Sequence, residues 1–347
     1  MVQRLPVTPL AYPVPALPPN SVFESPELKH ILDELSKYCP GAKPLGWENR
    51  WTWEMPVVHI MILDLLKRVY AFADWAVEHD DLPNYLGNSE ISVFQVHKHH
   101  QLEETKIFPQ WAAAAGLDVW TRNVEQHHLF SEALEATWLY LRKCRENLSP
   151  TPLPSPVPEP DEEINSIDLT KYGLDPTKPF SPTVLRAHMD TWVLVLAQHL
   201  LEEIDTLKPE LMKKIGEKEL KAIDAVVVKS LQAYDPSWFL SSFMASVHPN
   251  IRSVLVPLPY IVTWFLVPFV WSGKNWGFWR YCPYPEVKAH SPMERTNSIL
   301  VQIVDIDDSR PAMTIPAFVL SYEGSADSHG LRQSAFYARD NMAEERS

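Results

Sequence analysis

The 347-residue chain has few cysteines and few glycines, and each scarcity excludes a class of protein. Its three cysteines, Cys39, Cys144 and Cys282, are too few and too scattered for a disulfide framework, and no CxxC pair is present to hold zinc. Ten glycines against 32 prolines argue against a sheet protein with glycine turns. The glycines also form no P-loop, GxGxxG or GxSxG motif, so nucleotide binding and serine-type catalysis lack support.

Positive charge is also in short supply. The chain carries 31 basic and 44 acidic side chains, a net charge of -13. Such a surface repels phosphate backbones, so no nucleic-acid partner is expected. The proline-broken N-terminal stretch lacks the continuous apolar run of a signal peptide. Together with the few cysteines, this predicts a cytoplasmic protein.

One apolar segment, residues 254–271, has roughly the length of a membrane span and carries no charge. Its three prolines, Pro257, Pro259 and Pro268, argue against a regular helix through lipid. We therefore expect an aromatic-rich strap that covers a protein core. A contact of this segment with a membrane surface is the alternative.

The middle of the chain has apolar residues at three- and four-residue spacing, which predicts helices. A short helix is expected over 25–38, four long helices over 55–76, 89–111, 119–147 and 182–207, and a charged fifth helix over 210–234. A proline-rich linker follows at 149–181, and its first part, 149–163, should be extended and solvated. Residues 299–307 are a candidate strand.

These elements predict an all-α fold. Two short connections and one long one between the long helices favour an up-down-up-down four-helix bundle, with an extra helix and an irregular, aromatic and proline-rich C-terminal extension. The expected domains are a proline-rich N-terminal extension (1–48), the bundle with the linker inside it (49–235) and a C-terminal extension that packs on the bundle (236–347).

Each long helix carries at least one histidine in or near its apolar face, and two helices add a carboxylate four residues later. An i, i+4 pair places imidazole and carboxylate on one helix face. Side chains of this kind from four helices can converge in a nitrogen and oxygen cage that suits iron or manganese. The predicted metal ligands are His59, His99, Glu103, His127, His199 and Glu203.

Neighbouring residues have simpler interpretations. The pair of His100 and Glu104 is rotated by one hundred degrees from His99 and Glu103, which takes both residues off the inner face and predicts that they lie behind the ligands or on the surface. Glu125 and His128 form one E-x-x-H pair of the ferritin type, but a ferritin-like site needs two. His188 is expected to fill core or surface, or to donate to a ligand.

This order of residues resembles the hemerythrin-like, or HHE cation-binding, family, and in particular its larger fungal members. The resemblance covers about residues 50–207 and is carried by the phrase HHQLEETKIFP, in which counting back from Pro109 selects His99 and Glu103. It implies a dinuclear iron site, with manganese as the alternative metal, and dioxygen as a ligand. Two departures stand out, because Ser131 and Ile204 occupy positions where the oxygen carriers have a histidine and an aspartate; Glu203 can bridge instead.

Three functions are compatible with these features. The first is a non-heme di-iron oxidase or oxygenase that activates dioxygen on a small molecule, with the C-terminal aromatic region as a substrate chamber; an incomplete ligand set at Ser131 supports it. The second is a protein that binds, stores or senses iron or oxygen without an organic substrate. The third is a membrane-associated scaffold with a structural metal.

Overall fold

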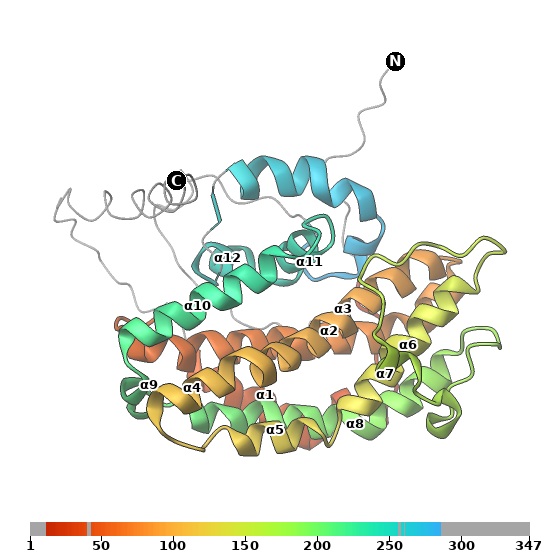
Figure 1. Ribbon diagram of the computed structural model, residues 1–347. Coiled ribbons are helices and arrows are strands. Elements are labelled where there is room, and N and C mark those ends of the chain that lie inside the picture. Colours follow the sequence, from red (N-terminus) through yellow and green to blue (C-terminus); the bar gives the residue numbers. More distant parts are fainter. Residues whose placement is uncertain (1–11, 40–42, 256–257, 260, 286–347) are drawn as a thin grey trace. The chain divides into compact units, whose positions relative to one another are not determined.

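The computed structural model describes residues 12–39, 43–255, 258–259 and 261–285, and these all lie in one compact unit that spans Met1–Ile306 (Figure 1). Every regular element of these residues is helical, which confirms the expected all-α class. The α-helices are α1 (Pro26–Tyr38), α2 (Arg50–Glu78), α3 (Leu82–Leu102), α4 (Phe108–Ala115), α5 (Thr121–His127), α6 (Ser131–Glu146), α7 (Glu162–Asn165), α8 (Pro182–Glu203), α9 (Pro209–Ile215), α10 (Glu217–Gln232), α11 (Phe239–Ser246) and α12 (Pro249–Leu255). Short 3-10 turns are η1 (Val22–Glu24), η2 (Trp47–Asn49), η4 (Leu169–Tyr172), η5 (Ile204–Leu207), η7 (Ser272–Asn275) and η8 (Phe278–Tyr281), and π-helical segments are η3 (Glu103–Ile107) and η6 (Val262–Trp271).

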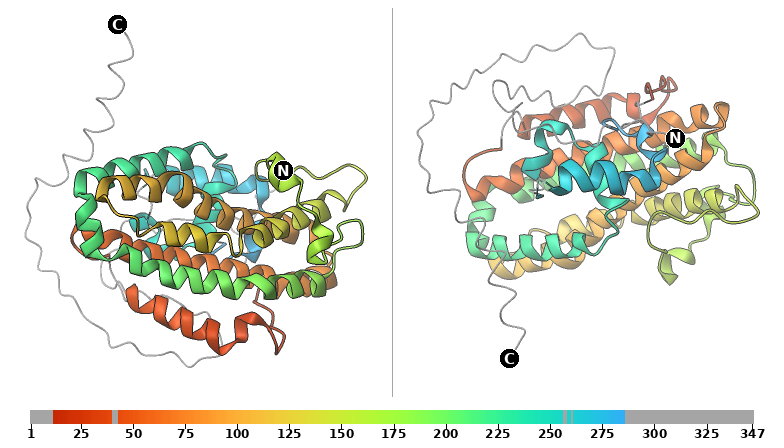
Figure 2. Two further views of the ribbon diagram at one scale, coloured as in Figure 1. Left: turned by 60° about the horizontal axis from the view of Figure 1, so that its bottom comes forward. Right: turned by 90° about the horizontal axis from the view of Figure 1, so that it is seen from above.

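Helix α1 forms where the sequence predicts a short helix. Ser25 caps it by accepting a hydrogen bond from the Leu28 amide, and Pro26 occupies the first turn, where no amide hydrogen is needed. Leu28, Ile31 and Leu35 form its buried face, which packs on α2 and α8 (Figure 2).

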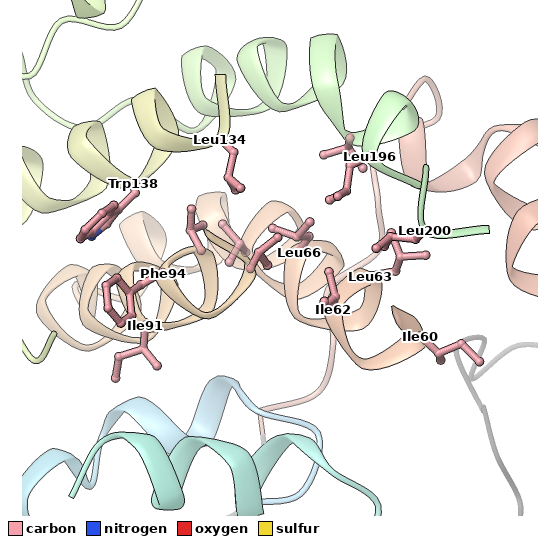
Figure 3. Close-up of a cluster of buried hydrophobic side chains, with 14 of the residues drawn as sticks. Ile60, Ile62, Leu63, Leu66, Ile91, Phe94, Leu134, Trp138, Leu196 and Leu200 are labelled. Atoms are coloured by element: carbon pink, nitrogen blue, oxygen red, sulfur yellow. The ribbon is translucent and has the colours of Figure 1, made fainter. Parts of the chain in front are cut away.

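The long helices pack side by side around a shared apolar core. Helix α2 contacts α3 and α8, and α6 contacts the same two helices. Figure 3 shows buried apolar side chains from all four helices, among them Ile62, Leu63 and Leu66 of α2, Phe94 of α3, Leu134 and Trp138 of α6, and Leu196 and Leu200 of α8. Burial of this many large apolar side chains supplies the main driving force for the fold.

Two of the predicted long helices are interrupted near their histidines. The second continues from α3 through the π-helical turn η3 into α4, and Pro109 lies in the first turn of α4 rather than at the end of the helix. The third is divided into α5 and α6 by a bend at residues 128–130. Both interruptions occur in the part of the chain that carries candidate ligands.

The proline-rich linker is held against the helices, contrary to the expectation of a solvated segment. Arg145 donates hydrogen bonds to the carbonyl of Pro154 (2.6 Å) and Arg142 to that of Pro158 (3.2 Å). Val157 is buried. The linker also contains the short helix α7 and the turn η4. Two arginines of α6 therefore satisfy carbonyls that would otherwise face water.

Beneath this linker, the buried carboxyl group of Glu90 predicts a pH dependence of stability. Burial raises its pKa to about 7, although a hydrogen bond from Ser155 (2.6 Å) and the charge of Arg142 oppose the shift. The pKa of Glu90 in the folded protein lies above its unfolded value of 4.5. The free energy of unfolding should therefore fall as pH rises from 4.5 to about 7, by up to about 3 kcal/mol.

The substitution Glu90→Gln should remove this loss. Urea unfolding at pH 5 and pH 8 will give the difference in free energy between parent and variant at each pH. We expect the free energy of unfolding of the variant, relative to that of the parent, to be higher at pH 8 than at pH 5. An equal difference at both pH values would contradict the assignment.

The chain after α8 differs from the single fifth helix that the sequence predicts. Gly216 lies between α9 and α10 and separates them. Its φ of 95° is a left-handed conformation that glycine adopts readily and other residues rarely do. Helix α10 then packs against η3 and α4. The chain downstream of α8 therefore lies against the segment that carries Glu103.

The described part of the apolar segment at 254–271 that forms η6 is only partly buried. Within η6, Val267 is buried, but Phe265, Phe269 and Val270 are 44%, 49% and 51% exposed. Among the described residues, no helix combines the length and the apolar character that a membrane crossing requires. The predicted strand at 299–307 lies outside the described residues.

Candidate metal centre

The first candidate ligand, His59, lies on α2 and is fully buried. Its Nδ1 donates to the carbonyl of Leu200 on α8 over 2.7 Å. This bond leaves the other ring nitrogen, Nε2, unprotonated and turned toward Glu203, whose Oε2 lies 3.5 Å away. His59 is therefore held as a ligand would be, with its free lone pair inward.

Helix α3 presents two successive histidines to the interior. The Nε2 of His99 lies 3.2 Å from Oε1 of Glu103, one turn later, as the i, i+4 spacing predicts. His100 is also buried, 3% exposed, and its Nδ1 bonds to the carbonyl of Val96 over 2.8 Å. The His99 ring faces His59, with centroids 5.5 Å apart, while the His100 ring faces His127 at 4.6 Å.

The π-helical turn η3 follows directly and changes which acidic side chains reach the centre. The Phe108 amide donates to the carbonyl of Glu103, a five-residue span that rotates later residues relative to regular α-helical spacing. Glu103 is fully buried. Glu104 reaches across to α5, where its Oε1 accepts a hydrogen bond from Nδ1 of His127 over 2.7 Å. Such π turns occur frequently at functional sites.

His127 is the last residue of α5 and is fully buried. Its Nε2 lies 2.9 Å from Nε2 of His199 and 3.8 Å from Oε2 of Glu103. The bend that follows directs α6 away, and the Ser131 hydroxyl donates to the carbonyl of His127 (2.7 Å). The serine therefore bonds to the backbone of its own segment.

Helix α8 supplies the remaining pair. His199 Nδ1 bonds to Oε1 of Gln126 (3.1 Å), and its Nε2 lies 3.4 Å from Oε2 of Glu203. Glu203 is fully buried at the end of the helix. Its Oε2 is thus close to both His59 and His199.

The inward donor atoms form two groups joined by the carboxylates. Within the described residues, the donor atoms of each of three sets lie within 4.8 Å of one another: His59, His99 and Glu103; His100, His127 and His199; and Glu103, His127 and Glu203. We call the His59 and His99 side the two-histidine side, and the His100, His127 and His199 side the three-histidine side. Glu103 belongs to two of the sets.

Most of these inward atoms have no hydrogen-bond partner. They are Nε2 of His59, His99 and His100 and both carboxylate oxygens of Glu103 and Glu203. A buried polar atom without a partner is destabilising, and a concentration of seven calls for a ligand that satisfies all of them. Two donors bound to one ion at about 2.1 Å lie no more than about 4.2 Å apart, which the measured separations of 2.9–3.8 Å satisfy. The residues present fit two metal ions.

The electrostatics agree with a site built for cations. Burial raises the pKa of Glu203 to about 7 and, together with the neighbouring charge of Glu203, raises the pKa of Glu103 well above its usual value. Burial lowers the pKa of His99 to about 3 and that of His199 to about 4. The imidazoles are therefore neutral, as metal ligands must be, and a cation would offset the cost of burying two carboxylates.

All six residues that the sequence singles out thus converge, while one neighbour was placed wrongly. His100 lies in the interior among the inward donors, whereas Glu104 lies behind His127, partly exposed, as the sequence predicts. Conversely, Glu125 and His128 are exposed, so the ferritin-like pair does not form part of the centre. His188 bonds to the carbonyl of Ala133 (2.9 Å), which is a structural role.

No protein-family model, curated protein or solved structure matches the chain, so the centre is interpreted from its own residues.

Proposed function

We propose that this chain is a hemerythrin-like protein whose four long helices form an up-down-up-down bundle around a dinuclear iron centre that binds dioxygen. The observation that carries the proposal is the cluster of seven unpartnered, buried donor atoms from α2, α3, η3 and α8. The absence of thiolate and the mixture of imidazole and carboxylate favour iron, with manganese as the alternative.

The residues divide the work of holding the ions. Glu103 and Glu203 lie between the two sides and are the candidates for bridges. The histidines hold the geometry, because their outer nitrogens are tied to fixed oxygens of the protein. Two ferrous ions, when bound, would supply the electrons with which dioxygen is bound or reduced. The protein excludes water and keeps the imidazole rings neutral.

The two sides of the centre differ in their number of nitrogen donors. The two-histidine side has His59 and His99, whereas the three-histidine side has His100, His127 and His199. The smaller number on the two-histidine side leaves more room there for a further ligand such as dioxygen.

Two uses of dioxygen fit this centre, and one observation ranks them. Open coordination positions on both ions would favour an oxidase or oxygenase that acts on a small molecule, and Ser131 was the main support for this function. His100 provides a nitrogen donor beside His127 and His199, which replaces the donor absent at Ser131. An ion on the three-histidine side would then be more nearly saturated than its neighbour, as reversible binding of dioxygen requires. This favours the second candidate, a protein that binds, stores or senses oxygen or iron.

The decisive measurement is an optical spectrum of anaerobically iron-loaded protein before and after oxygen, over several cycles of deoxygenation. We expect two iron ions per chain and a new absorption band upon mixing. A spectrum that returns to that of the reduced protein after each deoxygenation indicates reversible binding. A spectrum that does not return indicates irreversible oxidation of the iron, as in an oxidase. Metal content well below one ion per chain, after loading with iron or manganese, would contradict the proposed centre itself.

A further inference from the structure

The outer nitrogens of four histidines in the centre bond to oxygen atoms of different character. His59 and His100 donate to the backbone carbonyls of Leu200 and Val96. The side-chain amide of Gln126 accepts from His199. These acceptors are neutral. His127 differs, because its Nδ1 bonds over 2.7 Å to the carboxyl group of Glu104.

This inequality comes from the directions of two successive acids at the start of η3. Neighbouring residues of a helix point about 100° apart, so Glu103 points into the centre, toward Nε2 of His99 and of His127, whereas Glu104 meets the outer nitrogen of His127. The Glu104 side chain is 30% exposed, so it lies between His127 and the solvent.

We propose that Glu104 is a positioning residue that fixes the orientation of His127 and adds negative charge to the three-histidine side alone. This inference rests on the proposed dinuclear centre. An acceptor at Nδ1 holds the proton there, so the Nε2 lone pair points at Glu103 and His199. A carboxylate in this place also makes the imidazole a stronger metal ligand, as in carboxylate–histidine–metal arrangements.

The charge makes the two metal positions unequal. A negative charge one ring away from the metal favours the higher oxidation state, so the ion on the three-histidine side should be the easier to oxidise. His59 receives no such support from the carbonyl of Leu200.

The test compares Glu104→Ala and Glu104→Gln with the parent and with Glu125→Gln, a control at an exposed acid two residues before His127. In iron-loaded full-length protein, both Glu104 variants should bind one of the two ions about 10- to 100-fold more weakly. Glu104→Gln keeps an oxygen acceptor but loses the charge, so it should shift one reduction potential upward while the control leaves both unchanged. Affinities and potentials equal to those of the parent would overturn the proposal.

A second measurement uses the metal-free protein and separates this inference from the proposed function. Nitrogen NMR of labelled histidine should find the His127 proton on Nδ1 in the parent and in Glu104→Gln, and a mixture of tautomers in Glu104→Ala. An unchanged tautomer in Glu104→Ala would refute the positioning role. If the parent binds no pair of metals, the proposed function fails while this measurement still decides the role of Glu104.

Discussion

Replacing Glu103 or Glu203 with alanine should reduce the metal content of the protein from two ions per chain to one or fewer. Each carboxylate is fully buried, lies between two sets of donors and offers two oxygens that have no other partner. Its loss would remove an anionic ligand that stands within reach of both ions. The affinity should therefore fall by more than the roughly 10- to 100-fold that follows from loss of an outer partner. Metal analysis after gel filtration measures the effect.

The exposed acid Glu125 provides the matched control, because Glu125→Ala removes the same charge close in sequence to His127 without touching the centre. Metal content that falls equally in Glu125→Ala and Glu103→Ala would mean that net charge, and not coordination, holds the ions. Full metal content in both Glu103→Ala and Glu203→Ala would reject the bridging arrangement.

The same carboxylates should have the opposite effect on the metal-free protein. Their raised pKa values mean that ionisation opposes folding when no cation is present, and the opposition grows as pH rises toward about 7. At pH 8, Glu203→Gln should therefore melt no lower than the metal-free parent, yet lower than the metal-loaded parent. Thermal unfolding with and without iron tests this reversal of order.

Replacing His100 with alanine should remove one of the two ions and leave the other. His100 Nε2 is buried and unpartnered, and it completes the set with His127 and His199. The two-histidine side does not contain it, so one ion keeps its ligands. We expect about one ion per chain and loss of the oxygen-dependent absorption band.

His128→Ala is the matched control, since His128 is exposed and adjacent to His127 in the chain. It should bind two ions as the parent does. If His100→Ala binds two ions tightly, His100 is not a metal ligand, as the sequence alone predicted.

Local spacing was sufficient for much of this protein. The all-α class, the start of α1 at Ser25 and Pro26, and the start of α8 at Pro182 follow from residues within one helical turn of each boundary. The pair His99 and Glu103 and the pair His199 and Glu203 are also local, because the 3.6-residue period places both members on one face.

Other features depend on partners distant in sequence. The linker at 149–181 lies against α6 because Arg142 and Arg145 reach its carbonyls, and no local pattern in the linker encodes those contacts. The break in the charged fifth helix at Gly216 depends on both local sequence and fold. A glycine within a helical pattern marks a possible break, but the tertiary structure decides whether the helix is interrupted there.

His100 is where reasoning from period alone was wrong, and the reason is geometric. The period assigns one inner face to a helix, but near its end α3 meets His59 of α2 on one side and His127 and His199 on the other. Two side chains one hundred degrees apart can then both be interior. The π-helical turn further rotates the acids that follow. The sequence determined which residue types could bind metal. The tertiary structure decided that His100 lies among the inward donors, because His127 of α5 and His199 of α8 are brought beside it, and such a set depends on where several helices converge.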